Sequence, residues 1–161
     1  MIRLAPASKK PTLIAVLLVL VVGGIGGAAT EIGPWYLQLV KPSWQPPDWA
    51  FGPVWTLLYI TTSIAGVRAW RNADAQEKKY FLAAVLMNCV LNILWSVLFF
   101  KLHRPDLALM EVGALWLSVL ILTVLPWSYS RASTWLMVPH LFWVSTAACL
   151  NLSIVKLNGP F

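Results

Sequence analysis

Five apolar stretches follow one another along the chain and are separated by short polar connections. They cover residues 12–30, 51–70, 80–100, 107–127 and 134–155. Because a helix rises about 1.5 Å per residue, about twenty apolar residues cross the roughly 30 Å hydrocarbon core of a bilayer. The pattern predicts an all-α integral membrane protein, an up-and-down bundle of five transmembrane helices. Since most connections are short, consecutive helices are expected to be antiparallel neighbours.

The first stretch has an alternative interpretation as a secretory signal peptide. Residues 1–11 are basic, and small residues occur near its end, at 26–29. Both features are typical of signal peptides, whose apolar core is about 7–15 residues long. A first transmembrane helix is the favoured interpretation, because this stretch holds about nineteen apolar or small residues.

Residues 31–50 break the pattern with closely spaced prolines and aromatic side chains. The prolines are Pro34, Pro42, Pro46 and Pro47, and the aromatic residues are Trp35, Tyr36, Trp44 and Trp49. Prolines this dense prevent a continuous helix, so the segment is predicted to be a loop. Its aromatic content favours a place at the membrane interface or as a lid over a cavity.

Composition supports the membrane assignment and excludes soluble architectures. The 161 residues are 59% hydrophobic and 11% charged, and the mean hydropathy is +0.72. Too few charged residues are present to cover a soluble fold. Five helices leave no room for an aqueous domain, so residues 1–161 are predicted to form a single membrane domain.

The net charge of +6 comes from basic residues that lie between the apolar stretches. A nucleic-acid-binding protein needs a continuous basic face, so nucleic acid is not an expected partner, whereas membrane lipid is. Eight Lys and Arg residues fall on the N-terminal side of the predicted topology and four on the other side. This bias predicts an N-terminus on the inner side of a bacterial cell membrane.

Three of the predicted helices carry aromatic and polar side chains at helical spacing on one face. These are Phe51, Trp55, Tyr59 and Thr62 on the second, Asn88, Asn92, Trp95, Ser96 and Phe99 on the third, and His140, Trp143, Ala147 and Asn151 on the fifth. Such faces indicate a mostly apolar pocket for a flat hydrophobic ligand. The alternative is that the amides only hold helices together and the rings only fill the core.

Conventional catalytic groups are missing from the sequence. It contains no Ser/His/Asp set, paired carboxylates, glycine-rich phosphate loop or metal-ligand cluster, and Cys89 and Cys149 define no disulfide framework. His140 could serve as an axial haem ligand, and Glu111 could relay protons. Neither has a matching partner residue in the sequence, so both are minor alternatives.

Several short motifs occur in order between residues 30 and 158. They are Trp35-Tyr36, Lys41-Pro42-Ser43-Trp44, Pro46-Pro47, Phe51-Gly52-Pro53-Val54-Trp55, Leu58-Tyr59, Asn92-Ile93-Leu94-Trp95, Phe99-Phe100, Pro139 to Trp143 and Leu150-Asn151. Together they resemble the translocator protein/tryptophan-rich sensory protein family, also called the TspO/MBR or peripheral-type benzodiazepine receptor family.

The resemblance implies a five-helix bundle, often a homodimer, that binds porphyrins and related tetrapyrroles. Some family members bind sterols, and synthetic benzodiazepines and isoquinoline carboxamides are also ligands. Carried over by position, the ligand-binding residues are Tyr36, Pro46, Phe51, Trp55, Asn92, Trp143 and Ala147. No cofactor or metal is required, and porphyrin or haem is a ligand.

The chain departs from the family pattern at three positions. His140 and Glu111 replace a frequent tyrosine and aspartate, and Leu152 replaces the tyrosine of a sterol-recognition pattern. The last change argues against a sterol as the natural ligand.

The functional expectation is a receptor or sensor for tetrapyrroles, with a regulatory or transport role. One alternative is a sterol or tetrapyrrole transporter. The other is an enzyme that degrades porphyrins with light and oxygen, with Trp55 and Trp143 as its catalytic residues, because these match tryptophans implicated in porphyrin breakdown in the family.

Overall fold

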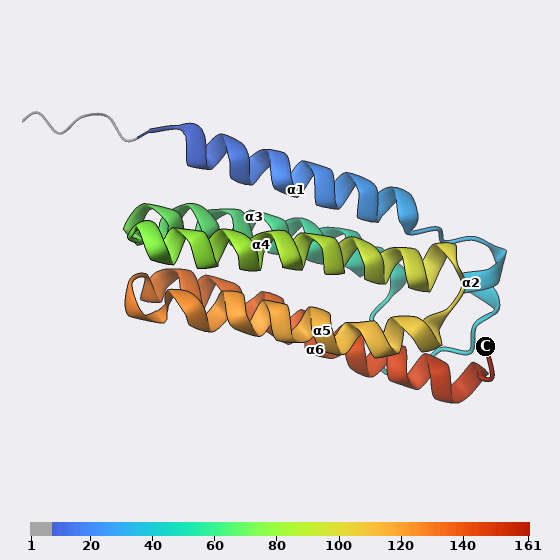
Figure 1. Cartoon of the computed structure of the whole chain (residues 1–161). Coiled ribbons are helices and arrows are strands. Elements are labelled where there is room, and N and C mark those ends of the chain that lie inside the picture. The colour runs from blue at the N-terminus through green and yellow to red at the C-terminus, as the bar shows by residue number, and fades with distance from the viewer. Residues whose placement is uncertain (1–7) are drawn as a thin grey trace, which may run out of the picture.

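A computed structural model of the chain describes residues 8–161, and every long element within them is a helix (Figure 1). The α-helices are α1 (Lys10–Ala29), α2 (Pro34–Gln38), α3 (Asp48–Asn72), α4 (Ala75–Ser96), α5 (Pro105–Val124) and α6 (Arg131–Asn158). A π-helical turn, η1 (Val97–Lys101), continues α4, and a 3-10 turn, η2 (Leu125–Ser128), continues α5. Five helices are long and apolar enough to cross a membrane, as predicted.

The last four transmembrane helices begin two to five residues before the apolar stretches that predicted them. Polar residues start these extra turns. Asp74 accepts a hydrogen bond from the Glu77 backbone, and the Glu77 carboxylate accepts one from the Asp74 backbone. Pro105 occupies the first turn of α5, where its missing N–H costs nothing. Apolar patterning identifies the part of a helix within hydrocarbon and misses such capped ends.

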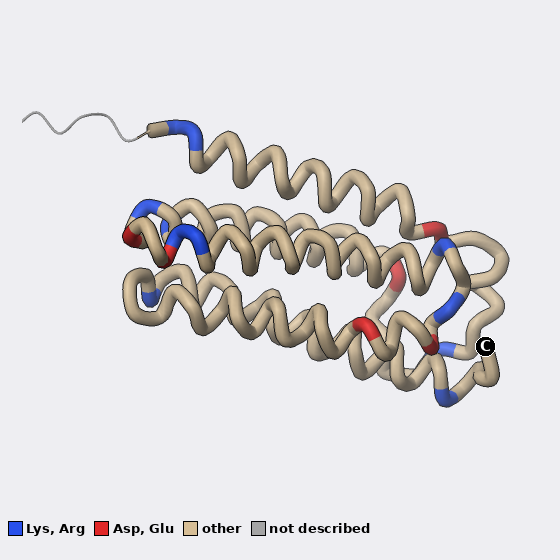
Figure 2. Tube along the Cα trace, in the orientation of Figure 1, with Lys and Arg blue, Asp and Glu red and all other residues tan. Residues whose placement is uncertain are grey.

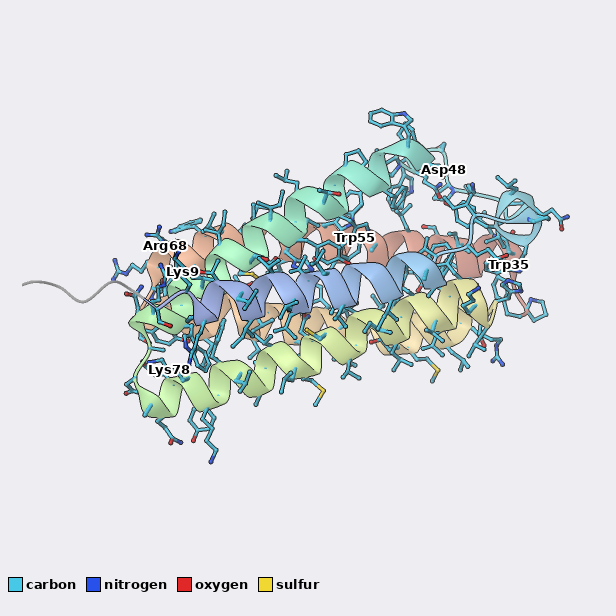
Figure 3. The ribbon with its side chains drawn as sticks, turned by 90° about the horizontal axis from the view of Figure 1, so that it is seen from above. Lys9, Trp35, Asp48, Trp55, Arg68 and Lys78 are labelled. Carbon is cyan, nitrogen blue, oxygen red and sulfur yellow. The ribbon has the colours of Figure 1, made fainter. Side chains whose placement is uncertain are left out.

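The prediction that consecutive transmembrane helices are neighbours is confirmed for α1 and α3, α4 and α5, and α5 and α6, but not for α3 and α4. The order is α1, α3, α6, α5 and α4, which again contacts α1. Seen from above, α1 lies over the space between α3 and α4 (Figure 3). Glycines permit this position, because a Cβ at Gly23 would lie 3.1 Å from the Tyr59 ring of α3. A Cβ at Gly26 would lie 3.7 Å from Ser96 Oγ of α4.

Hydrogen bonds between side chains join the other helices across the bundle. Asn88 of α4 donates to Ser118 of α5 at 2.9 Å, and Trp116 of α5 donates to Ser145 of α6 at 2.8 Å. Ser133 of α6 donates to the Ala65 carbonyl of α3 at 2.8 Å. Each bond satisfies a polar group that would otherwise be costly inside the membrane.

Helix α1 lacks such connections in its membrane-spanning part. Among the described residues, its one hydrogen bond to another helix joins Thr12 to Arg71 at 3.4 Å, near its N-terminal end. It is therefore held to α3 and α4 by apolar contact alone along most of its length.

The described chain termini lie at opposite ends of the bundle, as an odd number of spans requires (Figure 1). Charged residues gather at the two ends, and the middle of the bundle is almost free of them (Figure 2). Large apolar side chains are exposed along the helices, including Leu20, Leu57, Val90 and Phe142. This distribution is that of an integral multi-pass membrane protein.

Asn151 provides the most direct test of how the helices are held together. It is 1% exposed, accepts a hydrogen bond from Trp95 Nε1 at 3.2 Å and donates to the Pro105 carbonyl at 2.8 Å, so it joins α4, α5 and α6. Asn151→Ala is expected to lower the free energy of unfolding by about 1–3 kcal/mol, because two buried groups lose their partner. Thermal denaturation in detergent measures this, with Thr56→Ala, which removes an exposed hydroxyl bonded within its own helix, as control; equal melting temperatures for both variants would contradict it.

Candidate ligand-binding site

An elongated cavity of about 220 Å³ lies inside the bundle. Its wall is formed by α1 from Pro11 to Val22, α3 from Tyr59 to Trp70 and α4 from Phe81 to Asn92, with smaller contributions from Leu122, Pro126, Ser133, Met137 and His140. Along α1 the lining extends for about 16 Å. The cavity thus runs from the middle of the bundle to the end at which α1 begins.

The cavity exists because small residues stand where α1 faces α3. Ala15 lines it from α1 and Gly66 from α3. A Cβ added at Gly66 would meet no atom within 4 Å. The space between α3 and α4 is therefore covered by α1 but is not filled by side chains.

Two asparagines on α4 face the interior, and their side chains have different partners. Asn88 is fixed by its hydrogen bond to Ser118, which itself donates to the Leu115 carbonyl at 2.7 Å. Asn92 is 6% exposed, yet across residues 8–161 its side-chain amide makes no hydrogen bond. Asn88 holds α4 to α5, whereas the amide of Asn92 is available to a ligand in the cavity.

His140 closes the middle of the cavity from α6. It is 2% exposed, and its Nδ1 lies 3.1 Å from Thr62 Oγ1 of α3. Nε2 is buried among protein atoms and has no partner within the described residues. Because Nε2 does not face open space, an iron atom could bind there only after the ring moved.

An aromatic group continues from the cavity toward the loop end of α3 and α6. The Trp55 and Tyr59 rings have centroids 5.6 Å apart, and Trp55 contacts His140 edge-on at 6.0 Å. Phe51 and Trp143 make an edge-to-face contact at 5.5 Å. Since Tyr59 also lines the cavity, it connects the aromatic group to the open space.

The seven residues expected to bind ligand are divided among three places. Asn92 alone lines the cavity. Phe51, Trp55, Trp143 and Ala147 lie half-buried on α3 and α6, and Pro46 is half-buried before α3. Tyr36 is buried in a separate cluster with Phe99, Ala108 and Ile154. A ligand that touched most of them would extend from Asn92 past Tyr59 to the rings of Trp55 and Trp143.

Residues 31–50 were predicted to be a loop, but they include the short helix α2 and the first turn of α3. Trp35 stacks on His103 at 4.2 Å. Asn158 donates to the Val40 carbonyl at 2.9 Å and accepts from its amide at 2.7 Å. The segment is thus fastened across the end of the bundle by contacts with other parts of the chain.

Asp48 is the polar centre of this segment. It accepts hydrogen bonds from the Tyr36 hydroxyl at 3.0 Å and from Gln45 at 3.1 Å, and it pairs with Lys41 at 3.3 Å. Burial, together with the hydrogen bond to Asp48 and the charge of that residue, raises the pKa of Tyr36 to about 12. The phenol therefore remains a neutral hydrogen-bond donor at physiological pH.

Sequence reasoning missed the contribution of α1 and of Gly66 to the cavity. The glycines of α1 were the available signal, since close helix contact requires small residues. Nothing in the residue pattern showed that α1 covers the space between α3 and α4.

These features define an integral multi-pass membrane protein of five transmembrane helices with a mostly apolar interior cavity. Residues 15–157 match the TspO/MBR family, and the chain belongs to that family. It is 40% identical over 136 residues to Protein CrtK of Rhodobacter capsulatus, which covers 84% of this chain and 85% of that protein.

Two further relatives extend the similarity to other kinds of organism. The chain is 38% identical over 150 residues to Tryptophan-rich protein TspO of Archaeoglobus fulgidus, covering 90% of this chain and 95% of the relative. It is 29% identical over 126 residues to the human Translocator protein, covering 77% and 75%. These matches confirm the family resemblance that the sequence motifs indicated.

Proposed function

We propose that the protein is a membrane receptor or sensor that binds porphyrins and related tetrapyrroles inside the bundle. The observation that carries this proposal is the unpartnered amide of Asn92 in a mostly apolar cavity that continues into the rings of Tyr59 and Trp55. An apolar pocket with few orienting polar groups suits a flat, mostly hydrophobic molecule. Synthetic benzodiazepines and isoquinoline carboxamides share this chemistry.

The names of relatives agree with a sensory or translocating role. One relative, from Cereibacter sphaeroides, is called Tryptophan-rich sensory protein and is 36% identical over 135 residues. The human relative is called Translocator protein. A sterol is the weaker proposal for this chain, since Leu152 is 41% exposed on the outer face of α6 and lacks the tyrosine hydroxyl.

The size of the cavity indicates how a tetrapyrrole would be accommodated. At about 220 Å³ it is smaller than the roughly 300–1,000 Å³ of pockets that enclose drug-sized ligands. Binding therefore requires the wall to move or the ligand to extend beneath residues 31–50. Helix α1 is the wall that moves most easily, because no polar contact holds its middle to α3 or α4.

Membrane placement and assembly complete the proposal. Among the described residues, seven Lys and Arg side chains lie at the end where α1 begins and four at the other end. This supports an N-terminus on the inner side of a bacterial cell membrane. The exposed apolar helix faces allow lipid contact or a homodimer.

Asn92→Ala and its neighbour Asn88→Ala form a matched pair that tests the binding site. Asn92→Ala is expected to weaken protoporphyrin IX binding by about 1 kcal/mol or more while the melting temperature changes little, because only a ligand uses that amide. Asn88→Ala is expected to lower the melting temperature and to leave the affinity for protoporphyrin IX nearly unchanged, since the partner of its amide is Ser118. Tryptophan quenching and thermal denaturation measure the two effects. A loss of stability without a loss of affinity in Asn92→Ala would refute the proposed role of Asn92.

Photo-oxidative degradation of the porphyrin is the second candidate function. It is favoured by Trp55, which contacts both Tyr59 and His140 beside the cavity and so would lie against a bound ring. An indole can donate an electron to an excited porphyrin, and the reduced porphyrin passes that electron to oxygen. The indole cation then takes an electron back from the macrocycle, and the macrocycle cation combines with the superoxide, so that the porphyrin is oxidised and oxygen is reduced.

Replacement of Trp55 or Trp143 by Phe separates turnover from binding. If the protein degrades its ligand, each variant is expected to retain most affinity, because a phenyl ring still stacks, and to lose light-dependent bleaching under oxygen. Absorbance of bound protoporphyrin IX under illumination measures bleaching. Equal bleaching in wild type, variants and detergent alone would exclude an enzymatic role.

A further inference from the structure

The part of the cavity near the beginning of α1 is continuous with the proposed tetrapyrrole site but lies farther toward the α1 end of the bundle. Between Leu18 and the start of α1, the lining includes Pro11, Ala15, Val67 and Trp70. The unpartnered amide of Asn92 and the Trp55–Tyr59 pair lie farther toward the other end of the bundle. From Pro11 to Leu18 this part extends about 10 Å along α1. A long, apolar space of this kind fits a hydrocarbon chain better than a flat macrocycle.

The cavity has side chains on its rim that also face the membrane. Ile14 of α1 and Leu82 of α4 line it and are 55% and 40% exposed. Both belong to membrane-spanning helices, so the rim between α1 and α4 lies in the hydrocarbon region. A chain from the surrounding bilayer could enter there without passing through water.

Basic side chains lie at this end of the bundle. Figure 3 shows Lys9, Arg68 and Lys78 at the end where α1 begins, and Lys10, Arg71 and Lys79 belong to the same three helix ends. In the part of the chain that the structure describes, none of the six forms a salt bridge. At the opposite end, Lys41, Lys101 and Arg104 are each paired with a carboxylate.

We propose that this end of the bundle binds one anionic phospholipid, with an acyl chain in the cavity and the phosphate among Lys9, Arg68 and their basic neighbours. Basic residues at a membrane interface attract anionic lipid in general. The cavity beside them distinguishes this site from general attraction of lipid, because an acyl chain held between α1 and α4 fixes one lipid molecule at a defined position. Such a lipid would fill space next to Gly66 and support α1, independently of the proposed function.

Native mass spectrometry of the full chain in detergent tests the site with two lipids of identical chains. Palmitoyl-oleoyl phosphatidylglycerol is expected to remain bound as a single copy, at least about tenfold more than the phosphatidylcholine, because several basic residues each contribute. Arg68→Gln is expected to lower retention of the phosphatidylglycerol roughly fivefold. Lys156→Gln, a matched change at the opposite end, is expected to leave it unchanged.

Two glycine variants test the cavity itself. Gly66→Leu places a side chain in the open space, whereas Gly113→Leu adds the same atoms on the exposed face of α5, where a Cβ also meets nothing within 4 Å. Gly66→Leu is expected to lower phosphatidylglycerol retention about tenfold or more, and Gly113→Leu to have no effect. Ala15→Leu fills the same cavity from α1 and replaces Gly66→Leu if that variant does not fold.

Each outcome supports or overturns a part of the proposal. Equal retention of the two lipids by the wild type would overturn the assignment to an anionic lipid. Unchanged retention in Gly66→Leu and Ala15→Leu would overturn the cavity as the seat of the chain and leave adsorption of lipid to a basic surface. Because neither experiment uses a porphyrin, failure here is distinct from failure of the proposed function.

Discussion

Hydrogen bonds between buried polar side chains decide which helices of this protein are joined by polar contacts and which one is held mainly by apolar contact. In a bilayer, packing and interhelical hydrogen bonds hold helices together, since lipid is as apolar as the helix surface. Here such bonds join α3, α4, α5 and α6, through residues such as Asn88, Ser133 and Asn151. Within the described residues, α1 has one, to Arg71 near its end. The interior beside α1 is also where the cavity lies.

The same chemistry explains why two similar residues have different roles. Asn88 and Asn92 lie one helical turn apart on α4, and both are nearly inaccessible. Both line the cavity, but Ser118 of α5 stands opposite Asn88 and accepts its hydrogen bond, while the side chain of Asn92 has no such partner among the described residues. An amide with a partner stabilises the bundle, and an amide without one is costly until a ligand satisfies it. The residue type predicts that the amide needs a polar partner, and the residues on the neighbouring helix determine whether that partner is the protein or a ligand.

The sequence predicted the helices well because each one needs about twenty apolar residues, a local property of the chain. It did not predict that α1 separates α3 from α4, since that depends on how closely Gly23 approaches Tyr59. The sequence identified Asn92 and Trp55 as candidate ligand-binding residues. The position of the cavity could not be predicted, because it depends on Gly66 of α3 and on the lack of large side chains where α1 faces it. The sequence did not predict the short helix within residues 31–50. The contacts that hold this segment, from Trp35 to His103 and from Val40 to Asn158, join residues far apart in the chain.

Helix α1 is the proposed movable wall of the ligand site. Distances between spin labels on Leu17 and Leu86, exposed on α1 and α4, test it, with Cys89 and Cys149 replaced beforehand. With protoporphyrin IX bound, as verified by tryptophan quenching, this distance is predicted to increase. A second pair on Ile121 and Val138, on the hydrogen-bonded helices α5 and α6, should not change. Bound porphyrin with both distances unaltered would contradict the account.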